Sequence, residues 1–397
     1  MSATATTAGE RHPADRGEAI NQAGEQRSAR VESLRAIAAL AVVWGHIVAV
    51  SLALNPALPS ASDLGIGERI VYGGGYGVFF FFALTGYLLF WPFAKRYFGS
   101  GDHIDLQRYA VNRALRILPL YYAVVVVVLL LQANTPGLGV WARFLTFTET
   151  LSPGTAGRII GPAWSLVVEV CFYLLLPLLA YAIARLAGGS RRRAAAILMG
   201  LGLASLAVRV VTIYAADPVD PLWRLNIPAT FVFFVPGMLL ALLRLSWEER
   251  RPAWLHGPPL QGDLWILASI PLWALVLLVS YSLDFLVGAA AFLIVGACVL
   301  PVRTGPVTNA LQWRPLAILG VASYSLYLWH VPVLRAEIDA GVSTSFWILT
   351  AISIPVCVAV ALGSYAAIEW PFLRLRRQWA RSAARQEPDP RPARLPA

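Results

Sequence analysis

Few ionisable side chains fall inside the long apolar runs of this chain, and three of them could support proton transfer: His46, Glu169 and His330. A histidine titrates near neutral pH, so it can take a proton from a hydroxyl and return it to a leaving group. A nearby carboxylate would fix the tautomer of such a histidine and stabilise its imidazolium form. These residue types therefore allow general-base chemistry by a histidine with a carboxylate partner.

Each of the three residues also has a structural interpretation. His46 could be a packing histidine that is hydrogen-bonded across a helix bundle. His330 lies among aromatic residues that resemble an interfacial belt, and Glu169 could form an ion pair with a nearby arginine. Ionisable groups inside a membrane are costly and usually functional, so the functional interpretation is kept beside the structural one.

Two arginines, Arg113 and Arg116, are spaced to lie on one face of a helix. Two neighbouring guanidinium groups can bind a phosphate-bearing ligand through bidentate hydrogen bonds. We expect them at the cytoplasmic mouth of a span that begins near residue 117. The alternative is that they are ordinary cytoplasmic arginines that hold lipid headgroups, and the same alternative applies to Arg35.

The elements that must position these side chains are membrane-spanning helices. The chain of 397 residues is 58% hydrophobic and only 14% charged, and its apolar residues form long runs rather than alternating patterns. We predict an all-α, polytopic membrane bundle with about ten transmembrane helices, because lipid cannot satisfy free backbone groups. The predicted spans are roughly 34–54, 72–93, 117–133, 164–186, 194–215, 228–245, 263–281, 284–302, 316–336 and 345–371.

The arginines of the connecting segments predict the topology. They are concentrated before the first span and in every second loop, which places both termini in the cytoplasm of a multi-pass cell-membrane protein. This topology puts His46, Glu169 and His330 at similar depths, somewhat outward of the membrane midplane. Residues 1–30 and 374–397 are predicted as disordered cytoplasmic tails that flank one membrane domain, residues 31–373. The N-terminal segment lacks the pattern of a cleaved signal peptide.

The net charge of +10 does not predict a nucleic-acid partner, because the basic residues lie between apolar runs and in the tails, where membrane lipids are the expected partners. The three cysteines lie inside apolar runs without metal-ligand spacing, so no metal site is predicted.

Six sequence motifs follow one another along the predicted spans, and together they carry a family resemblance. They are residues 34–40 with His46 downstream, 77–80 with 85–87, 113–119, 164–169 with 172–173, 323–330 and 369–372. In this order and position they resemble acyltransferase family 3 of bacterial membrane proteins, over about residues 31 to 373.

The resemblance implies transfer of an acetyl or related acyl group onto a hydroxyl of a sugar, a lipid or a secondary metabolite. It implies that His46 is catalytic and that Arg113 and Arg116 bind acyl-CoA, which serves as a donor substrate rather than a tightly bound cofactor. Within the matching motifs we expect Trp164, Tyr324 and His330 to line the substrate site, with Glu169 catalytic beside His46. The chain departs from the family pattern at two positions: Thr85 replaces the usual serine, and Val170 replaces a frequent second acidic residue.

Several alternatives remain open at this point. The acyl group could pass directly from donor to acceptor, or it could rest on a protein residue between two transfers. The acceptor could be a polysaccharide sugar, a glycolipid or a macrolide-like compound. Ten spans with a few internal ionisable groups also fit a secondary transporter, and a non-catalytic membrane scaffold is a further possibility.

Overall fold

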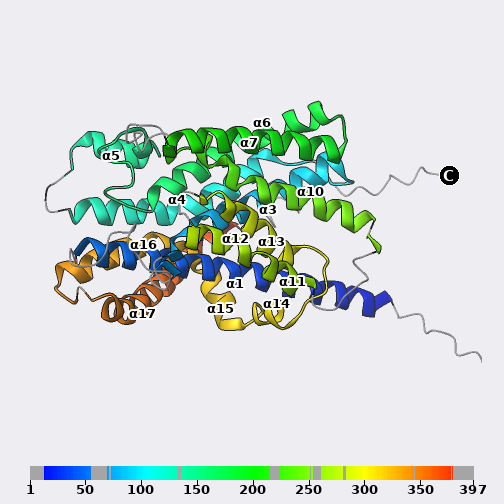
Figure 1. Ribbon diagram of the computed structural model, residues 1–397. Coiled ribbons are helices and arrows are strands. Elements are labelled where there is room, and N and C mark those ends of the chain that lie inside the picture. The colour runs from blue at the N-terminus through cyan, green and yellow to red at the C-terminus, as the bar shows by residue number, and fades with distance from the viewer. Residues whose placement is uncertain are drawn as a thin grey trace, which may run out of the picture.

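The described part of the chain consists mostly of helices joined by loops, and it contains no strand (Figure 1). The computed structural model describes residues 13–54, 69–70, 73–132, 134, 136–214, 224–250, 252–253, 261–279, 283–343, 345–376 and 378. The predicted C-terminal tail beyond residue 378 lies outside these residues. The long helices run side by side along one direction in Figure 1, as expected for a bundle that crosses a membrane.

The helices follow one another in a simple order. The first half contains α1 (Pro13–Leu54), η1 (Gly73–Tyr76), α3 (Gly77–Phe98), α4 (Leu106–Leu130), α5 (Leu138–Leu145), η2 (Glu149–Leu151), α6 (Ala163–Ala187) and α7 (Arg191–Tyr214). The second half contains α9 (Ile227–Thr230), η3 (Phe231–Phe233), α10 (Val235–Glu249), α11 (Gln261–Ala268), α12 (Ile270–Ala274), η5 (Leu275–Val279), α13 (Leu286–Val299), α14 (Pro306–Ala310), α15 (Arg314–Val321), α16 (Ser323–Asp339), α17 (Phe346–Ser364) and η7 (Tyr365–Glu369).

The all-α membrane fold predicted from the sequence is confirmed. Within the described residues, eight helices are long and apolar enough to cross a membrane. The predicted ninth span, 316–336, is a bent pair of helices, α15 and α16, which meet at 71°. The predicted eighth span, 284–302, contains the shorter apolar helix α13. The ten predicted apolar segments are therefore present, but two of them are not single helices of full length.

The bend between α15 and α16 leaves backbone groups free at the start of α16. The two helices meet at Ala322, and Ser325 lies in the first turn of α16. The first N–H groups of a helix have no partner within that helix. The carboxylate of Glu369 accepts the Ser325 N–H at 3.1 Å and the Ser325 hydroxyl at 2.6 Å. The bend therefore creates a site at which a carboxylate from η7 binds the start of α16.

Glycines allow the central helices to approach closely. A Cβ added at Gly237 of α10 would lie 1.8 Å from the Ala83 carbonyl oxygen of α3. A Cβ added at Gly86 of α3 would lie 2.2 Å from the Phe234 carbonyl oxygen. Such backbone-to-backbone contacts are typical of packing between membrane helices, where small residues let the helices meet. The α3–α10 pair therefore forms the centre of the core.

The N-terminal tail predicted as disordered is helical from Pro13 onward, as part of α1. The part of α1 that is apolar enough to span a membrane begins at Ala29, close to the predicted domain boundary. A helix that is already nucleated grows by one hydrogen bond for each residue fixed, so the span can extend into the polar segment without a new nucleus.

One end of the bundle is rich in basic residues, and we call it the basic end. It is defined by Lys95, Arg96, Arg185 and Arg191. Arg191, at the start of α7, donates to the Phe98 carbonyl oxygen at the end of α3 and to the Glu249 carboxylate of α10. Lys95 and Arg96 lie in the last turn of α3, and Arg185 lies in the last turn of α6. The helix ends predicted to share one side of the membrane therefore meet at one end of the bundle.

The opposite end contains a buried carboxyl group, Glu149 of η2, which is 1% exposed. The Tyr121 hydroxyl lies 3.5 Å from Glu149 Oε1 and donates to the Phe144 carbonyl oxygen at 2.8 Å. Burial raises the pKa of Glu149 to about 8, because removal from water disfavours the charged form. Glu149 is therefore protonated in the folded protein at neutral pH.

Glu149 should make the protein less stable as the pH rises. Between its ordinary pKa, near 4.5, and its folded value of about 8, the folded state holds a proton that the unfolded state has lost. Stabilisation by this group is thus complete below pH 4.5 and is lost by about pH 8. We expect the thermal midpoint in detergent to fall less between pH 6 and pH 8.5 in Glu149→Gln than in the native protein. Equal falls in both proteins would contradict this assignment.

Candidate active site

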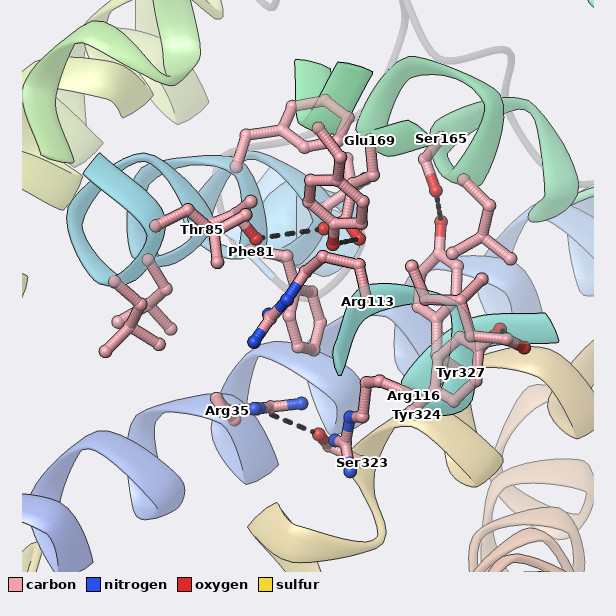
Figure 2. Close-up of a pocket in the computed structure, with 18 residues that line it drawn as sticks. Arg35, Phe81, Thr85, Arg113, Arg116, Ser165, Glu169, Ser323, Tyr324 and Tyr327 are labelled. Atoms are coloured by element: carbon pink, nitrogen blue, oxygen red, sulfur yellow. Dashed lines mark hydrogen bonds between the residues drawn. The ribbon is translucent and has the colours of Figure 1, made fainter. Parts of the chain in front are cut away.

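A polar cavity of about 100 Å³ lies inside the bundle, between α1, α3, α4, α6 and α16 (Figure 2). Its polar lining consists of Arg35, Thr85, Arg113, Arg116, Ser165, Glu169, Tyr173, Ser323, Tyr324 and Tyr327. A cavity of this size with so many polar groups is far more hydrophilic than the membrane that would surround it. Because buried polar groups are costly unless they interact with partners or ligands, the cavity is the strongest candidate site in the described residues.

Glu169 lies in this cavity, and both of its carboxylate oxygens accept hydrogen bonds. Thr85 of α3 donates to Oε1 at 3.1 Å, and Tyr173, one turn further along α6, donates to Oε2 at 2.6 Å. These two hydrogen bonds hold the Glu169 carboxylate in the cavity, which Arg35, Arg113 and Arg116 also line. The sequence placed Glu169 beside His46, whereas its hydrogen bonds in the structure go to Thr85 and Tyr173. A similar depth in the membrane did not bring the two groups into contact.

Three guanidinium groups converge on the cavity from α1 and α4 (Figure 2). Arg35 donates to the Ser323 hydroxyl at 3.3 Å, and Arg116 forms an ion pair with Glu369 at 3.2 Å. The Nε of Arg113 is buried and has no hydrogen-bond partner within the described part of the chain. Arg113 is therefore the guanidinium that is most available to a ligand.

The arginine pair lies within a helix rather than just before it. Helix α4 begins at Leu106 rather than near residue 117, so Arg113 and Arg116 lie about 10 Å and 15 Å along the helix from its start. Residues 106–116 are rich in polar side chains, so the apolar run that predicted the span does not include this part of the helix. Both arginines line the interior cavity.

His46 and His330 form a contact pair between α1 and α16. The Nε2 atom of His330 lies 3.3 Å from Nδ1 of His46, and the ring centroids are 4.8 Å apart. His330 Nδ1 lies 2.7 Å from the Tyr327 carbonyl oxygen, and His46 Nδ1 lies 3.0 Å from the Val42 carbonyl oxygen. A carbonyl oxygen can only accept, so both Nδ1 atoms carry the proton.

This tautomer has a direct chemical consequence for His46. Its Nδ1–H is shared between the Val42 carbonyl oxygen and the free lone pair of His330 Nε2. Its own Nε2 keeps a lone pair that can accept a proton. His330 thus occupies the place beside His46 that the sequence assigned to a carboxylate.

A wall of side chains separates the cavity from the histidine pair. Tyr327 and Phe81 line the cavity, and their rings are 5.8 Å apart. The Tyr327 ring also lies 5.9 Å from the His330 ring, while His46 is not among the residues that line the cavity. The guanidinium cluster and the histidine pair are therefore neighbouring compartments that meet at Tyr327.

The remaining predicted site residues lie around the same cavity. Tyr324 lines it and donates to the Ile117 carbonyl oxygen at 3.0 Å. Trp164 packs edge-on against Phe82, so it supports the cavity wall without lining it. Sequence reasoning gave no site role to Ser165, Tyr173, Ser323, Tyr327 or Glu369. Helical spacing could have found two of them, because Ser165, Glu169 and Tyr173 succeed one another at intervals of four residues.

Comparison with known proteins gives this site a family context. The family model described as an acyltransferase domain matches residues 28–368. The Bacillus subtilis (strain 168) protein named "Putative peptidoglycan O-acetyltransferase YrhL" is 29% identical over 350 residues, which cover 79% of this chain and 52% of that protein. "Nodulation protein 10" of Rhizobium leguminosarum bv. viciae is 26% identical over 329 residues, which cover 76% of this chain and 82% of that protein.

The chain thus spans about half the length of the Bacillus relative. No solved structure matches the chain significantly. The fold and the matched segment define a multi-pass membrane protein of the acyltransferase class. The chain belongs to acyltransferase family 3, as its sequence motifs predicted. Membership favours acyl transfer over the alternative of a secondary transporter.

Proposed function

We propose that the protein transfers an acetyl or other short acyl group from acyl-CoA to a hydroxyl of a carbohydrate, lipid or secondary metabolite. The observation that carries this proposal is the spacing of a guanidinium and an imidazole on α1. Arg35 and His46 are eleven residues apart, which is about three turns or 16 Å along one face of the helix. A donor with a long flexible arm between its phosphates and its thioester matches that separation.

The cationic part of the site would hold the donor. Arg113 has a buried Nε with no hydrogen-bond partner among the described residues. Arg35 lines the same cavity, where its polar contacts among those residues are the neutral Ser323 hydroxyl and a carboxylate oxygen of Glu32 at 3.7 Å. Both can offer charge-assisted hydrogen bonds to phosphate oxygens. Arg116, which is already paired with Glu369, would act by shaping the site. With the basic end in the cytoplasm, both chain termini would be cytoplasmic, and the donor would enter from that side.

The histidine pair would activate the acceptor. His46 Nε2 takes the proton of the acceptor hydroxyl while the hydroxyl oxygen attacks the thioester carbon. His330 Nε2 accepts the His46 Nδ1–H and so stabilises the charge that develops on the ring. The name of the Bacillus relative supports a carbohydrate hydroxyl as the acceptor class. Direct transfer needs no further protein nucleophile.

The proposal is tested with inverted membrane vesicles from producing cells, which carry their own acceptors. Vesicles with and without the protein are given acetyl-CoA that is radiolabelled in the acetyl group. We expect label in an alkali-labile ester only where the protein is present. If inserted protein transfers no label, the proposed donor and activity are wrong.

Arg113 and Arg116 should respond differently to replacement by alanine. Loss of a charged hydrogen bond to the donor costs about 1.5–3 kcal/mol, so Arg113→Ala should raise the KM for acetyl-CoA about 10- to 150-fold without changing thermal stability. Arg116→Ala leaves the buried Glu369 carboxylate unpaired, so it should also lower the thermal midpoint. Initial rates and thermal unfolding in detergent give both quantities.

The control for both arginine variants is Arg96→Ala, which removes an exposed guanidinium at the end of α3. We expect this variant to keep the native KM and thermal midpoint. Equal changes in KM for all three variants would show that a general loss of positive charge, rather than the cavity, is responsible.

A further inference from the structure

Two hydroxyl groups border the cavity where it approaches the histidine pair. The Tyr327 and Ser165 oxygens lie 2.6 Å apart, and both residues line the cavity (Figure 2). Tyr327 also contacts His330, because its carbonyl oxygen accepts from His330 Nδ1 and its ring lies next to the His330 ring. The hydroxyl pair therefore lies between the compartment proposed for the donor and the proposed base.

The protons of this pair can be redirected to a ligand. The carbonyl oxygen of Pro162 lies 3.1 Å from Ser165 Oγ and 3.3 Å from the Tyr327 hydroxyl. Two hydroxyls carry two protons, of which one joins the pair and the other is hydrogen-bonded to the Pro162 carbonyl oxygen. Hydroxyl hydrogens rotate freely to suit their partners, so one proton can turn toward an oxygen in the cavity without breaking the 2.6 Å contact.

The other tyrosine hydroxyls at the cavity each donate to an acceptor of their own. Tyr173 donates to the Glu169 carboxylate at 2.6 Å, and Tyr324 donates to the Ile117 carbonyl oxygen at 3.0 Å. A neutral ligand oxygen would compete poorly for the Tyr173 proton, because that proton is bound to a carboxylate. Within the described part of the chain, the Tyr327 ring contacts His330 and the Tyr324 ring does not. Of the cavity's tyrosine hydroxyls, that of Tyr327 is thus the one that lies near the histidine pair and can still donate to a ligand, and Ser165 is its partner.

We propose that the hydroxyls of Tyr327 and Ser165 stabilise the oxyanion that forms when the thioester is attacked. This inference rests on the proposed function and deepens it by naming the group that binds the thioester oxygen. The pair is held in place by α6 and α16 before the reaction, as a donor for a developing charge must be.

The atoms balance in the following sequence. The acceptor oxygen forms a bond to the thioester carbon as its proton passes to His46 Nε2, and the carbonyl electron pair moves onto the thioester oxygen. The hydroxyl of Tyr327, supported by Ser165, donates a hydrogen bond to that oxyanion. The carbonyl then re-forms, the carbon–sulfur bond breaks with its electron pair on sulfur, and His46 returns the proton to the thiolate. The products are an ester and free CoA.

Tyr327→Phe removes one hydroxyl and keeps the ring of the wall. Loss of one oxyanion donor typically slows the chemical step about 10²- to 10³-fold. We expect that loss in the maximal rate of acetyl transfer from labelled acetyl-CoA in membrane vesicles, with the KM for acetyl-CoA within about threefold of native. The matched control is Tyr109→Phe, which removes a half-buried hydroxyl that bonds the Tyr173 carbonyl oxygen outside the cavity lining.

A double-variant cycle with Ser165→Ala tests whether the two hydroxyls act together in the reaction or only link α6 to α16. Because the two hydroxyls act as one unit, the combined variant should be little slower than Tyr327→Phe alone. All variants should keep a thermal midpoint near that of Tyr109→Phe.

Three outcomes overturn the proposal. One is a Tyr327→Phe rate equal to that of Tyr109→Phe while the native protein is active, which removes the oxyanion role and leaves the proposed function intact. Another is a fall in rate that follows a fall in thermal midpoint, which assigns the pair to structure. The third is a native protein that transfers no label, which removes the proposed function and this inference with it.

Discussion

Replacement of His46 by alanine should lower the rate of acyl transfer about 10²- to 10⁴-fold, which is the usual contribution of a general base. In the structure His46 is held by two partners on its Nδ1 side, so its Nε2 lone pair is fixed in direction. The alanine variant loses the base but few packing contacts, because His46 is only half-buried. The measurement is the initial rate of label transfer at saturating acetyl-CoA.

The control is another histidine, His103, which is exposed between α3 and α4. His103→Ala should transfer label at the native rate, within about twofold. Membrane insertion of both variants is checked by their yield after detergent extraction. A correctly inserted His46→Ala protein that works at the native rate would refute the assignment of the base.

Replacement of Gly237 by alanine should destabilise the bundle strongly. The added Cβ would lie 1.8 Å from the Ala83 carbonyl oxygen and 2.5 Å from the Tyr87 nitrogen, so the obstacle is backbone that cannot rotate away. Overpacking typically costs about 1–3 kcal/mol, and a backbone obstacle at the centre of the core places this variant at the upper end or beyond. We expect a clearly lower thermal midpoint in detergent and a lower yield of folded protein.

Gly363→Ala in α17 is the matched control, since an added Cβ there meets nothing within 4 Å. Alanine favours the helix over glycine by about 0.5–1 kcal/mol, so this variant should unfold at the native temperature or slightly above it. If Gly237→Ala unfolds at the same temperature as Gly363→Ala, the close approach of α3 and α10 is not a feature of the folded protein.

The positions of the helices were largely predictable because apolar runs report directly on burial in lipid. The fold departs from that prediction where tertiary packing decides. A Cβ at Gly320 would lie 1.8 Å from the Glu32 carbonyl oxygen, so α15 lies tightly against α1, and the chain then bends before α16. Neither the close approach of α15 to α1 nor the bend can be predicted from the hydropathy of the sequence.

Several residues that the sequence singled out come together in the structure, but the contacts that they make were not predictable. Topology placed His46, Glu169 and His330 at similar depths, and His46 does contact His330. The rotation of a helix about its own axis is set by packing rather than by length, and the rotation of α6 directs Glu169 toward Thr85. For the same reason the ion pair of Arg116 with Glu369 could not be deduced from sequence.

The wall formed by Phe81 and Tyr327 has a consequence for the membrane as a whole. A polar cavity that ran continuously through the bundle would offer water, protons and ions a passage down their electrochemical gradients. In the structure, the rings of Phe81 and Tyr327 lie between the cavity and the histidine pair, so a thioester on its way to His46 must pass them. Rings that move aside only for a bound donor would let the protein keep charged groups inside the bundle without opening a path for ions.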